Sequence, residues 1–301
     1  THCISSAASD VYKRQIQEAV SFLQVSVHLF RLIAFYSVLY FFGNITLATE
    51  NNPKVVSLNV CTDQFVMLLA DDSQIISLSE ISTDILSSAM AEEASKYHQN
   101  NSGAEEVYLL QPDIVFAGIY TAKATVNMLE SLGIRVEKFE PANTIEQIIL
   151  NMQRTGKLLG HTDRANTLVA NFEARLTDLT TGINTRPRAA LYYANGYTTG
   201  ENTLAGQILD LAGFSNIASE IGIHWGGTLP LELLIMSKPD VIITGTTYPG
   251  SSRSEEILKH PALKPLRHVS STDANWVCGT PHIVTAIEDL QTIHPDKMST
   301  K

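Results

Sequence analysis

The stretch GAEEVYLLQPDIVFAG at residues 103–118 has a counterpart in PLELLIMSKPDVIITG at residues 230–245. Each copy runs from a glutamate to a Pro-Asp pair, and then through a short apolar run to a glycine. The matched positions are Glu105 and Glu232, Pro112 and Pro239, Asp113 and Asp240, and Gly118 and Gly245. Apolar residues before each Pro-Asp pair have helical spacing, and the β-branched run after it is typical of a buried strand. The chain therefore uses one α-turn-β unit twice, which predicts two similar lobes with a cleft between them.

The segments around the two copies are also alike. An opening strand is predicted before each copy, followed by a helix and a second strand, and a helix or strand follows each copy. The paired segments are KVVSLN (54–59) with RAALYYANG (188–196), and TDQFVMLLADDSQIISLS (62–79) with TLAGQILDLAGFSNIAS (203–219). The expected fold class is α/β, with two Rossmann-like β/α lobes at residues 53–142 and 185–301.

Residues 143–184 differ in character from both lobes. They contain no proline and carry apolar residues at helical spacing, including Ile148, Met152 and Phe172. We expect one long α-helix that joins the lobes, bent or broken at residues 160–163.

Composition excludes several classes of protein. The chain has 301 residues, of which 44% are hydrophobic and 17% charged, as in ordinary globular proteins. A net charge of −10 without any Lys/Arg-rich run argues against a nucleic-acid partner. Three cysteines are too few for a disulfide framework or a cysteine-ligated metal centre.

The N-terminal residues carry two processing signals. Residues 1–15 resemble vector-derived sequence and are interpreted as a non-native leader, the alternative being a natural flexible terminus. Within residues 16–48, Arg31, an apolar run over 32–42 and a small-residue site at Ala48 form the three parts of a secretory signal peptide. Cleavage near Ala48 would give a periplasmic protein, whereas retention would make a membrane-anchored sensor domain.

The ordered set of motifs resembles a known family. KVVSLNVCTDQ, the two Pro-Asp units, the long connector, LYYANGYTTG and WVCGTP together are similar to periplasmic substrate-binding proteins of ABC importers. The similarity is to the subgroup that takes up cobalamin and ferric siderophores, and it covers about residues 53–292. The resemblance implies two lobes joined by one rigid helix, with a ligand held between them. It also implies that Glu105 and Glu232 dock onto arginines of the permease. Without the resemblance, both are simply carboxylates near helix N-termini.

Ligands of α/β sheets bind beyond the carboxyl ends of the strands. This rule selects a set of candidate ligand-binding residues at those ends, in which aromatic walls suit a large, partly apolar ligand. They are Asn59, Cys61, Thr62, Tyr120, Asn195, Tyr197, Trp225, Tyr248 and Trp276.

Cysteines and histidines leave alternatives open. Cys61 and Cys278 fit buried small residues in tight turns, a disulfide across the cleft, or direct contact with the ligand. The nine histidines show no metal-ligand spacing, although His224 and His282 are candidates for contact with a ligand metal. No metal site or resident cofactor is expected apart from the cargo, a cobalt corrinoid or ferric chelate.

The sequence thus predicts a monomeric, non-catalytic solute-binding protein that captures a cobalamin-like or ferric-siderophore chelate and delivers it to an ABC permease. One alternative is the same scaffold with haem or another metal chelate. Another is a metal-cluster oxidoreductase subunit on a duplicated α/β fold.

Overall fold

A computed structural model describes residues 52–246, 250 and 252–298. The predicted leader at 1–15, the signal-peptide region at 16–48 and Tyr248 lie outside the described residues. From Asn52 onward the chain forms one compact unit. Within the part described, no helix combines the length and apolar character needed to cross a membrane.

The N-terminal lobe is built on a five-stranded parallel sheet in the order β3-β2-β1-β4-β5. Its central strands are buried except at the partly buried Gly118, as expected for a parallel sheet covered by helices on both faces. The strands are β1 (Val55–Ser57), β2 (Ile75–Ser79), β3 (Gln99–Asn100), β4 (Ile114–Gly118) and β5 (Val136–Phe139). The helices are α2 (Val60–Leu69), α3 (Ala91–Ala94), α4 (Ala104–Leu109) and α5 (Lys123–Ser131), with short 3₁₀ turns η1 (Asp72–Gln74) and η2 (Glu80–Thr83).

The C-terminal lobe repeats this order in a four-stranded sheet, β11-β10-β6-β8. Since β6, β8, β10 and β11 correspond to β1, β2, β4 and β5, the predicted duplication is confirmed at the level of topology. These strands are β6 (Arg188–Leu191), β8 (Ser215–Asn216), β10 (Val241–Gly245) and β11 (His268–Thr272). An antiparallel pair that the sequence analysis did not predict, β7 (Tyr197–Thr199) and β9 (Gly226–Thr228), is added to this lobe.

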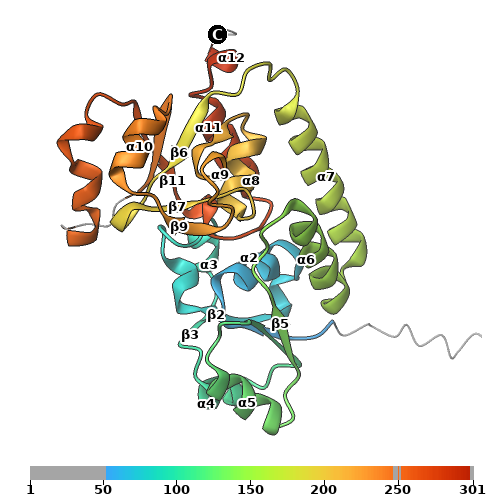
Figure 1. The fold of residues 1–301 in the computed structure, drawn as a ribbon. Coiled ribbons are helices and arrows are strands. Elements are labelled where there is room, and N and C mark those ends of the chain that lie inside the picture. Colours follow the sequence, from blue (N-terminus) through green and yellow to red (C-terminus); the bar gives the residue numbers. More distant parts are fainter. Residues whose placement is uncertain (1–51, 247–249, 251, 299–301) are drawn as a thin grey trace, which may run out of the picture. The chain divides into compact units, whose positions relative to one another are not determined.

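Helices and 3₁₀ turns of the C-terminal lobe surround this sheet (Figure 1). The helices are α8 (Leu204–Leu211), α9 (Ile217–Glu220), α10 (Leu231–Ser237), α11 (Ile283–Gln291) and α12 (Pro295–Met298). The 3₁₀ turns are η3 (Ala194–Gly196), η4 (Arg253–Lys259), η5 (Pro261–Leu263) and η6 (Ala274–Trp276).

The repeated Pro-Asp pair has the same structural role in both lobes. The carboxylate of Asp113 accepts a hydrogen bond from the backbone N–H of Lys54 at 2.7 Å, and Asp240 accepts one from Arg188 at 2.7 Å. The backbone N–H groups of both aspartates donate in return to the carbonyl oxygens of the same two residues. Each aspartate therefore fixes the start of its lobe's first strand beside the strand that follows the aspartate.

The connector consists of two helices, α6 (Ile145–Leu158) and α7 (Thr162–Thr180), divided within one residue of the predicted break. Gly160 adopts a left-handed conformation with φ of +80°. The N–H of His161 donates to the carbonyl of Gly156 at 2.7 Å, and the N–H of Gly160 donates to Lys157 at 3.4 Å. This pair of bonds is a Schellman motif, which ends α6.

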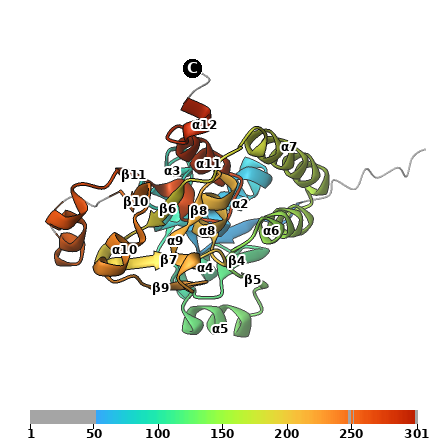
Figure 2. The same cartoon turned by 45° about the horizontal axis from the view of Figure 1, so that its top comes forward.

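After this turn the chain folds back on itself. A Cβ on Gly156 would overlap the Cβ of Ala165, although nine residues of continuous helix would separate them by about 13 Å. The expectation of one long α-helix is therefore wrong in this detail, because left-handed Gly160 reverses the chain direction. Figures 1 and 2 show α6 and α7 side by side, with α7 running along both lobes.

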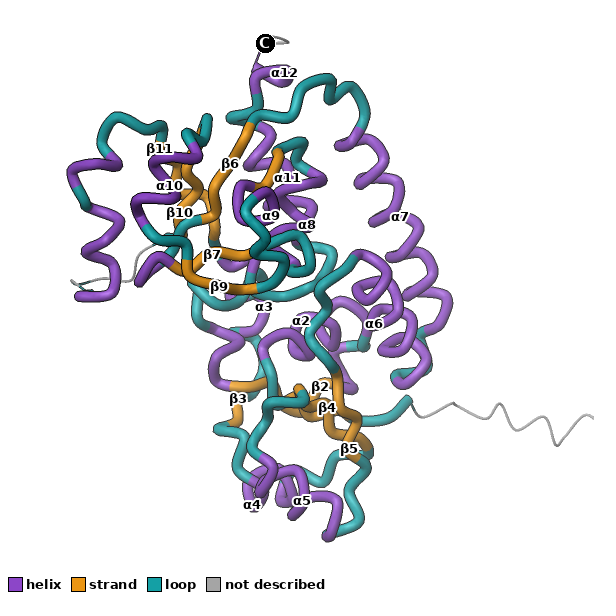
Figure 3. The backbone as a smooth tube through the Cα atoms, in the orientation of Figure 1, coloured by secondary structure: helices purple, strands orange, loops and turns teal. Residues whose placement is uncertain are grey.

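One hydrophobic cluster continues from lobe to lobe through the connector. It includes Phe65 of α2, Met152 of α6, Phe172 of α7, Ile208 of α8 and Ile287 of α11, all nearly or fully buried. Figure 3 shows these helices grouped around the junction. The lobes are thus joined by packing as well as by the chain.

Candidate functional site

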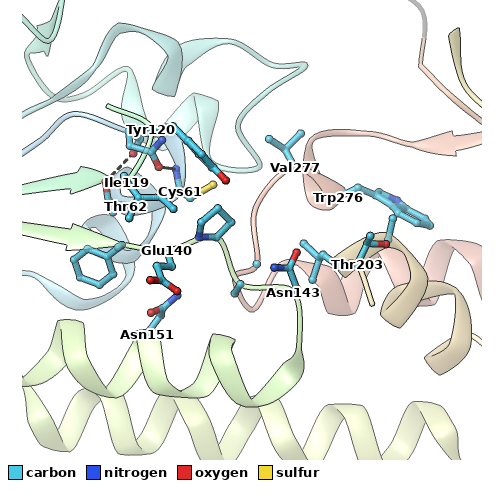
Figure 4. A pocket seen from close by; sticks show the side chains of 18 of the residues that line it. Cys61, Thr62, Ile119, Tyr120, Glu140, Asn143, Asn151, Thr203, Trp276 and Val277 are labelled. Atoms are coloured by element: carbon cyan, nitrogen blue, oxygen red, sulfur yellow. Dashed lines mark hydrogen bonds between the residues drawn. The ribbon is translucent and has the colours of Figure 1, made fainter. Parts of the chain in front are cut away.

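A cavity of about 310 Å³ lies between the lobes, at the carboxyl ends of the strands. Figure 4 shows Thr62 and Tyr120 on the side of the N-terminal lobe, with Thr203 and Trp276 across the space from them. Its volume is at the lower end of the range for ligand pockets, about 300–1,000 Å³. The position is the one predicted from the strand-end rule.

The first wall is formed where β1 turns into α2. Asn59 caps α2, its Oδ1 accepting from the N–H of Cys61 at 3.0 Å. The hydroxyl of Thr62 bonds the hydroxyl of Ser57 at 2.7 Å and the carbonyl of Asn59 at 2.9 Å. All three predicted residues of this turn, Asn59, Cys61 and Thr62, line the cavity.

A buried carboxyl group lies directly behind this wall. Asp63 accepts hydrogen bonds from the N–H and the hydroxyl of Ser79. Burial raises the pKa of Asp63 to about 7, against the lowering effect of its bonds to Ser57 and Ser79. The carboxyl is fully buried, so it supports the turn from behind.

The end of β4 contributes an apolar part of the mouth. Gly118 lets the chain approach Asn59, because a Cβ there would lie 3.1 Å from Asn59 Nδ2. Ile119 and Tyr120 follow and line the cavity, with Tyr120 83% exposed. Tyr120 was predicted, whereas Gly118 and Ile119 were not.

The segment after β5 forms a polar part of the wall that the sequence analysis missed. Glu140, Asn143 and Asn151 line the cavity, the last from α6. Figure 4 shows Glu140 and Asn151 next to each other. The strand-end rule, applied to β5 as well as to β1 and β4, would have selected residues 140–143.

The second lobe lines the cavity from β7, the start of α8 and η6. Tyr197 and Trp276, both predicted, are joined by Thr199 and Thr203, which were not. Trp276 is only 8% exposed and belongs to the interlobe core, so it packs in that core and also lines the cavity. A Cβ on Gly226 would overlap the hydroxyl of Tyr197, and glycine in β9 therefore makes room for this ring.

A disulfide bond joins Cys61 to Cys278, with their Cα atoms 5.2 Å apart. Of the three alternatives, the covalent bond across the lobes is the one observed. Cys61 therefore lines the cavity as half of a disulfide and presents no free thiol to a ligand.

Two predicted contact residues lie outside the cavity. Asn195 adopts a left-handed conformation with φ of +56°, and this turn directs it to a separate hollow on the second lobe that Glu232 also lines. Trp225 is 59% exposed and absent from the cavity wall, although its carbonyl accepts from Gly200, next to Thr199. Both residues lie next to the unpredicted β7–β9 pair, Asn195 in the turn before β7 and Trp225 just before β9.

The two glutamates predicted for docking occupy matching positions in the first turns of α4 and α10. Glu105 and Glu232 are both exposed, and neither forms an ion pair with any described residue. Both are therefore open to a partner.

Metal-binding side chains do not gather anywhere in the described part of the chain. His224 binds the carboxylate of Glu201 at 2.6 Å, and neither His224 nor His282 lines the cavity. Burial lowers the pKa of His282, which favours the neutral ring.

Residues 55–271 match the family model described as periplasmic binding protein, well over half of the chain. The chain belongs to the periplasmic binding protein family. The name of this family refers to the periplasm, outside the cytoplasmic membrane, and to binding of a solute rather than catalysis. A disulfide agrees with such an oxidising compartment.

This periplasmic binding protein has relatives with named cargoes. It is 27% identical over 211 residues to a cobalamin-binding protein of Halobacterium salinarum, covering 68% of this chain and 57% of the relative, so that it spans little more than half of that protein. It is 23% identical over 260 residues to a vitamin B12-binding protein of Vibrio parahaemolyticus, covering 83% of this chain and 92% of the relative. Its fold is similar to that of a periplasmic heme-binding protein of Vibrio cholerae, with a TM-score of 0.68 and 17% identity over 80% of this chain and 99% of the other.

Proposed function

We propose that this protein captures a corrinoid of the cobalamin type between its lobes and delivers it, unchanged, to the permease of an ABC importer. The observation that carries the proposal is the interlobe cavity, whose mouth is lined by the exposed side chains of Ile119, Tyr120, Tyr197 and Val277. Exposed apolar and aromatic groups at a cavity suit a large ligand with a flat apolar face. The names of the sequence relatives support cobalamin as the cargo.

Two alternatives are weaker on the same evidence. Haem is consistent with the fold, which resembles that of a heme-binding protein, but that similarity carries no residue-level argument. A metal-cluster oxidoreductase subunit would need free cysteines, and Cys61 and Cys278 are bonded to each other.

The deciding experiment is a set of calorimetric titrations of the purified chain. The ligands are cyanocobalamin, haemin and a ferric hydroxamate siderophore. We expect saturable binding of cyanocobalamin at one site per chain. Binding of haemin or the siderophore without cyanocobalamin would overturn the cargo assignment.

An aromatic pair provides a matched control for the site. Tyr197→Ala should weaken cyanocobalamin binding by about tenfold, since a buried aromatic contact contributes on the order of 1 kcal/mol or more. Trp225→Ala removes another exposed aromatic side chain that lies outside the cavity wall, and it should leave the affinity unchanged. Equal losses in both variants would place the ligand elsewhere.

Delivery is proposed to depend on Glu105 and Glu232 as a pair. Charge-assisted contacts between a carboxylate and arginine fix orientation at an interface. The double variant Glu105→Ala/Glu232→Ala should retain ligand affinity while uptake in a reconstituted importer falls. Glu92→Ala/Glu146→Ala, which removes two exposed acids from other helices, should transport normally. Unchanged uptake in the first variant contradicts the docking role.

Export is proposed to proceed through a signal peptide cleaved near Ala48, giving a monomeric periplasmic protein. Mass spectrometry of protein from the host's extracytoplasmic fraction should find a chain that starts near Thr49. A retained N-terminal segment in the membrane fraction would favour the anchored alternative.

A further inference from the structure

The cavity wall described here carries one charged side chain. Among the described residues that line the cavity, Glu140 is the single Asp, Glu, Lys, Arg or His. The remaining polar side chains of that wall are neutral and include Asn59, Asn143 and Asn151. Uncharged amides complement the amide groups at the edge of a corrin ring, whereas one carboxylate sets the sign of the local potential.

The basic side chains around β5 are paired with acids other than Glu140. Arg135 and Arg154 both bind Glu137, at 2.7 and 2.6 Å. Arg154 also stacks over the ring of Phe139, 4.4 Å from its centre. Lys138 pairs with Glu130 at 2.8 Å.

Glu140 itself has no ion-pair partner among the described residues, and its side chain is exposed at the cavity. Figure 4 shows it on the cavity side of the strand end, beside Asn151. It is thus a charge available to a ligand.

A single carboxylate at the cavity would affect chelates according to their charge. Haem carries two propionates, and ferric catecholate siderophores are polyanions, so each would meet a carboxylate where an arginine or lysine is needed. The net charge of −10 on the whole chain acts in the same direction. This negative charge would attract a cationic ligand and repel an anionic one.

We propose that Glu140 is a specificity-determining residue that makes the cleft select positively charged corrinoids over neutral and anionic chelates. The inference rests on the proposed function, because it assigns a charge class to the ligand of the same site.

The test compares corrinoids that differ in charge. Aquacobalamin and aquacyanocobinamide are cations near pH 6, whereas cyanocobalamin is neutral. Glu140→Gln should weaken binding of both cations by about three- to fivefold, the effect of an exposed ion pair of up to about 1 kcal/mol. The same variant should leave the affinity for cyanocobalamin unchanged.

Glu146→Gln is the matched control, since it removes an exposed carboxylate outside the cavity and should change none of the affinities. The loss in Glu140→Gln should also shrink as salt is raised. Equal affinities of the wild-type protein for cationic and neutral corrinoids, or an unchanged preference in Glu140→Gln, overturn the inference and leave the proposed function standing. Failure of every corrinoid to bind the wild-type protein overturns the proposed function instead.

Discussion

Asp113 and Asp240 occupy matched positions of the sequence repeat and make the same backbone contacts in the two lobes. Both carboxylates accept from a backbone N–H at the start of their lobe's opening strand, Lys54 just before β1 and Arg188 in β6, at the same distance of 2.7 Å. The residues before the two Pro-Asp pairs, Gln111 and Lys238, are left-handed with φ of 50° and 49°. The repeat therefore preserves a turn and a backbone anchor rather than a catalytic group.

Removing the anchor should cost stability in equal measure in both lobes. Asp113→Ala and Asp240→Ala are each expected to lower the free energy of unfolding by about 1–2 kcal/mol, because each loses a charge-assisted hydrogen bond. Asp113→Asn and Asp240→Asn retain an acceptor oxygen and should cost less. Urea denaturation of the four variants measures this, and equal losses in the Ala and Asn variants would show that the bond is unimportant.

Asp63 predicts a pH dependence of stability. Its pKa in the folded protein is raised to about 7 by burial, above the value of an unfolded aspartate, about 3.9. The folded state therefore binds more protons between pH 4 and 7, and the contribution of Asp63 to stability is lost as pH rises through 7. Asp63→Asn removes this titration.

The comparison of unfolding free energies at pH 4.5 and 8 tests this expectation. The gain of the Asn variant relative to wild type should be larger at pH 8, by an amount up to about 3 kcal/mol. A difference between the two proteins that is the same at both pH values would mean that Asp63 titrates normally.

At the scale of elements, the connector depends on two glycines with different roles. Gly160 supplies the left-handed residue that ends α6, and Gly156 allows α7 to pack closely at Ala165. The sequence analysis found the break at residues 160–163, but it did not predict the reversal. Helical periodicity reports which face is buried and not whether the next helix continues or folds back.

The close packing of α6 against α7 can be tested by moving a methyl group from residue 165 to residue 156. Gly156→Ala should destabilise the protein by about 1–3 kcal/mol, because its Cβ would overlap that of Ala165. Adding Ala165→Gly should recover part of the loss, since the contact volume is then restored. Thermal unfolding of the single and double variants distinguishes this outcome from a simple change of helix propensity, which two substitutions would not reverse.

Other elements show where sequence patterns succeed. The predicted strand at residues 75–79 coincides with β2, and the strands after both Pro-Asp pairs lie where expected. These runs are apolar because they are buried by the sheet's own helices. By contrast, β7 and β9 are short strands with polar and glycine residues, so no alternation marked them. Asn195 and Trp225, which lie next to these strands, are outside the cavity wall.

The residues of the candidate site also divide into those that the sequence predicted and those that it did not. Asn59, Thr62, Tyr120, Tyr197 and Trp276 line the cavity as predicted because they follow recognisable strand ends or lie in loops beside them. Glu140 lies equally close to a strand end, but nothing in an exposed glutamate distinguishes it from a surface residue. The pairing of nearby cations with other acids became visible only in three dimensions.

At the scale of the whole molecule, the two lobes are held by a common core and by the Cys61–Cys278 bond. The bond closes a loop of 217 residues. Closing such a long loop should strongly reduce the conformational entropy of the unfolded chain, although the measured stabilisation by disulfides correlates weakly with loop length. The core should keep the lobes together even when the bond is absent.

Cys61→Ala/Cys278→Ala should therefore lower the free energy of unfolding by about 2–5 kcal/mol and leave one cooperative transition. Differential scanning calorimetry measures both quantities. Two separate transitions in the variant would show that the lobes unfold independently and that the shared core contributes little. Wild-type protein under a thiol reductant should behave as the variant does.

The same bond has a practical consequence for anyone who produces this protein. Its sulfur atoms come from opposite ends of the polypeptide, so oxidation must follow synthesis of nearly the whole molecule. Expression in a bacterial cytosol, where thiols stay reduced, would yield protein without this disulfide bond. The mass of that protein would be greater by two hydrogen atoms. Intact-mass analysis of each batch would tell whether a measured affinity belongs to the secreted form.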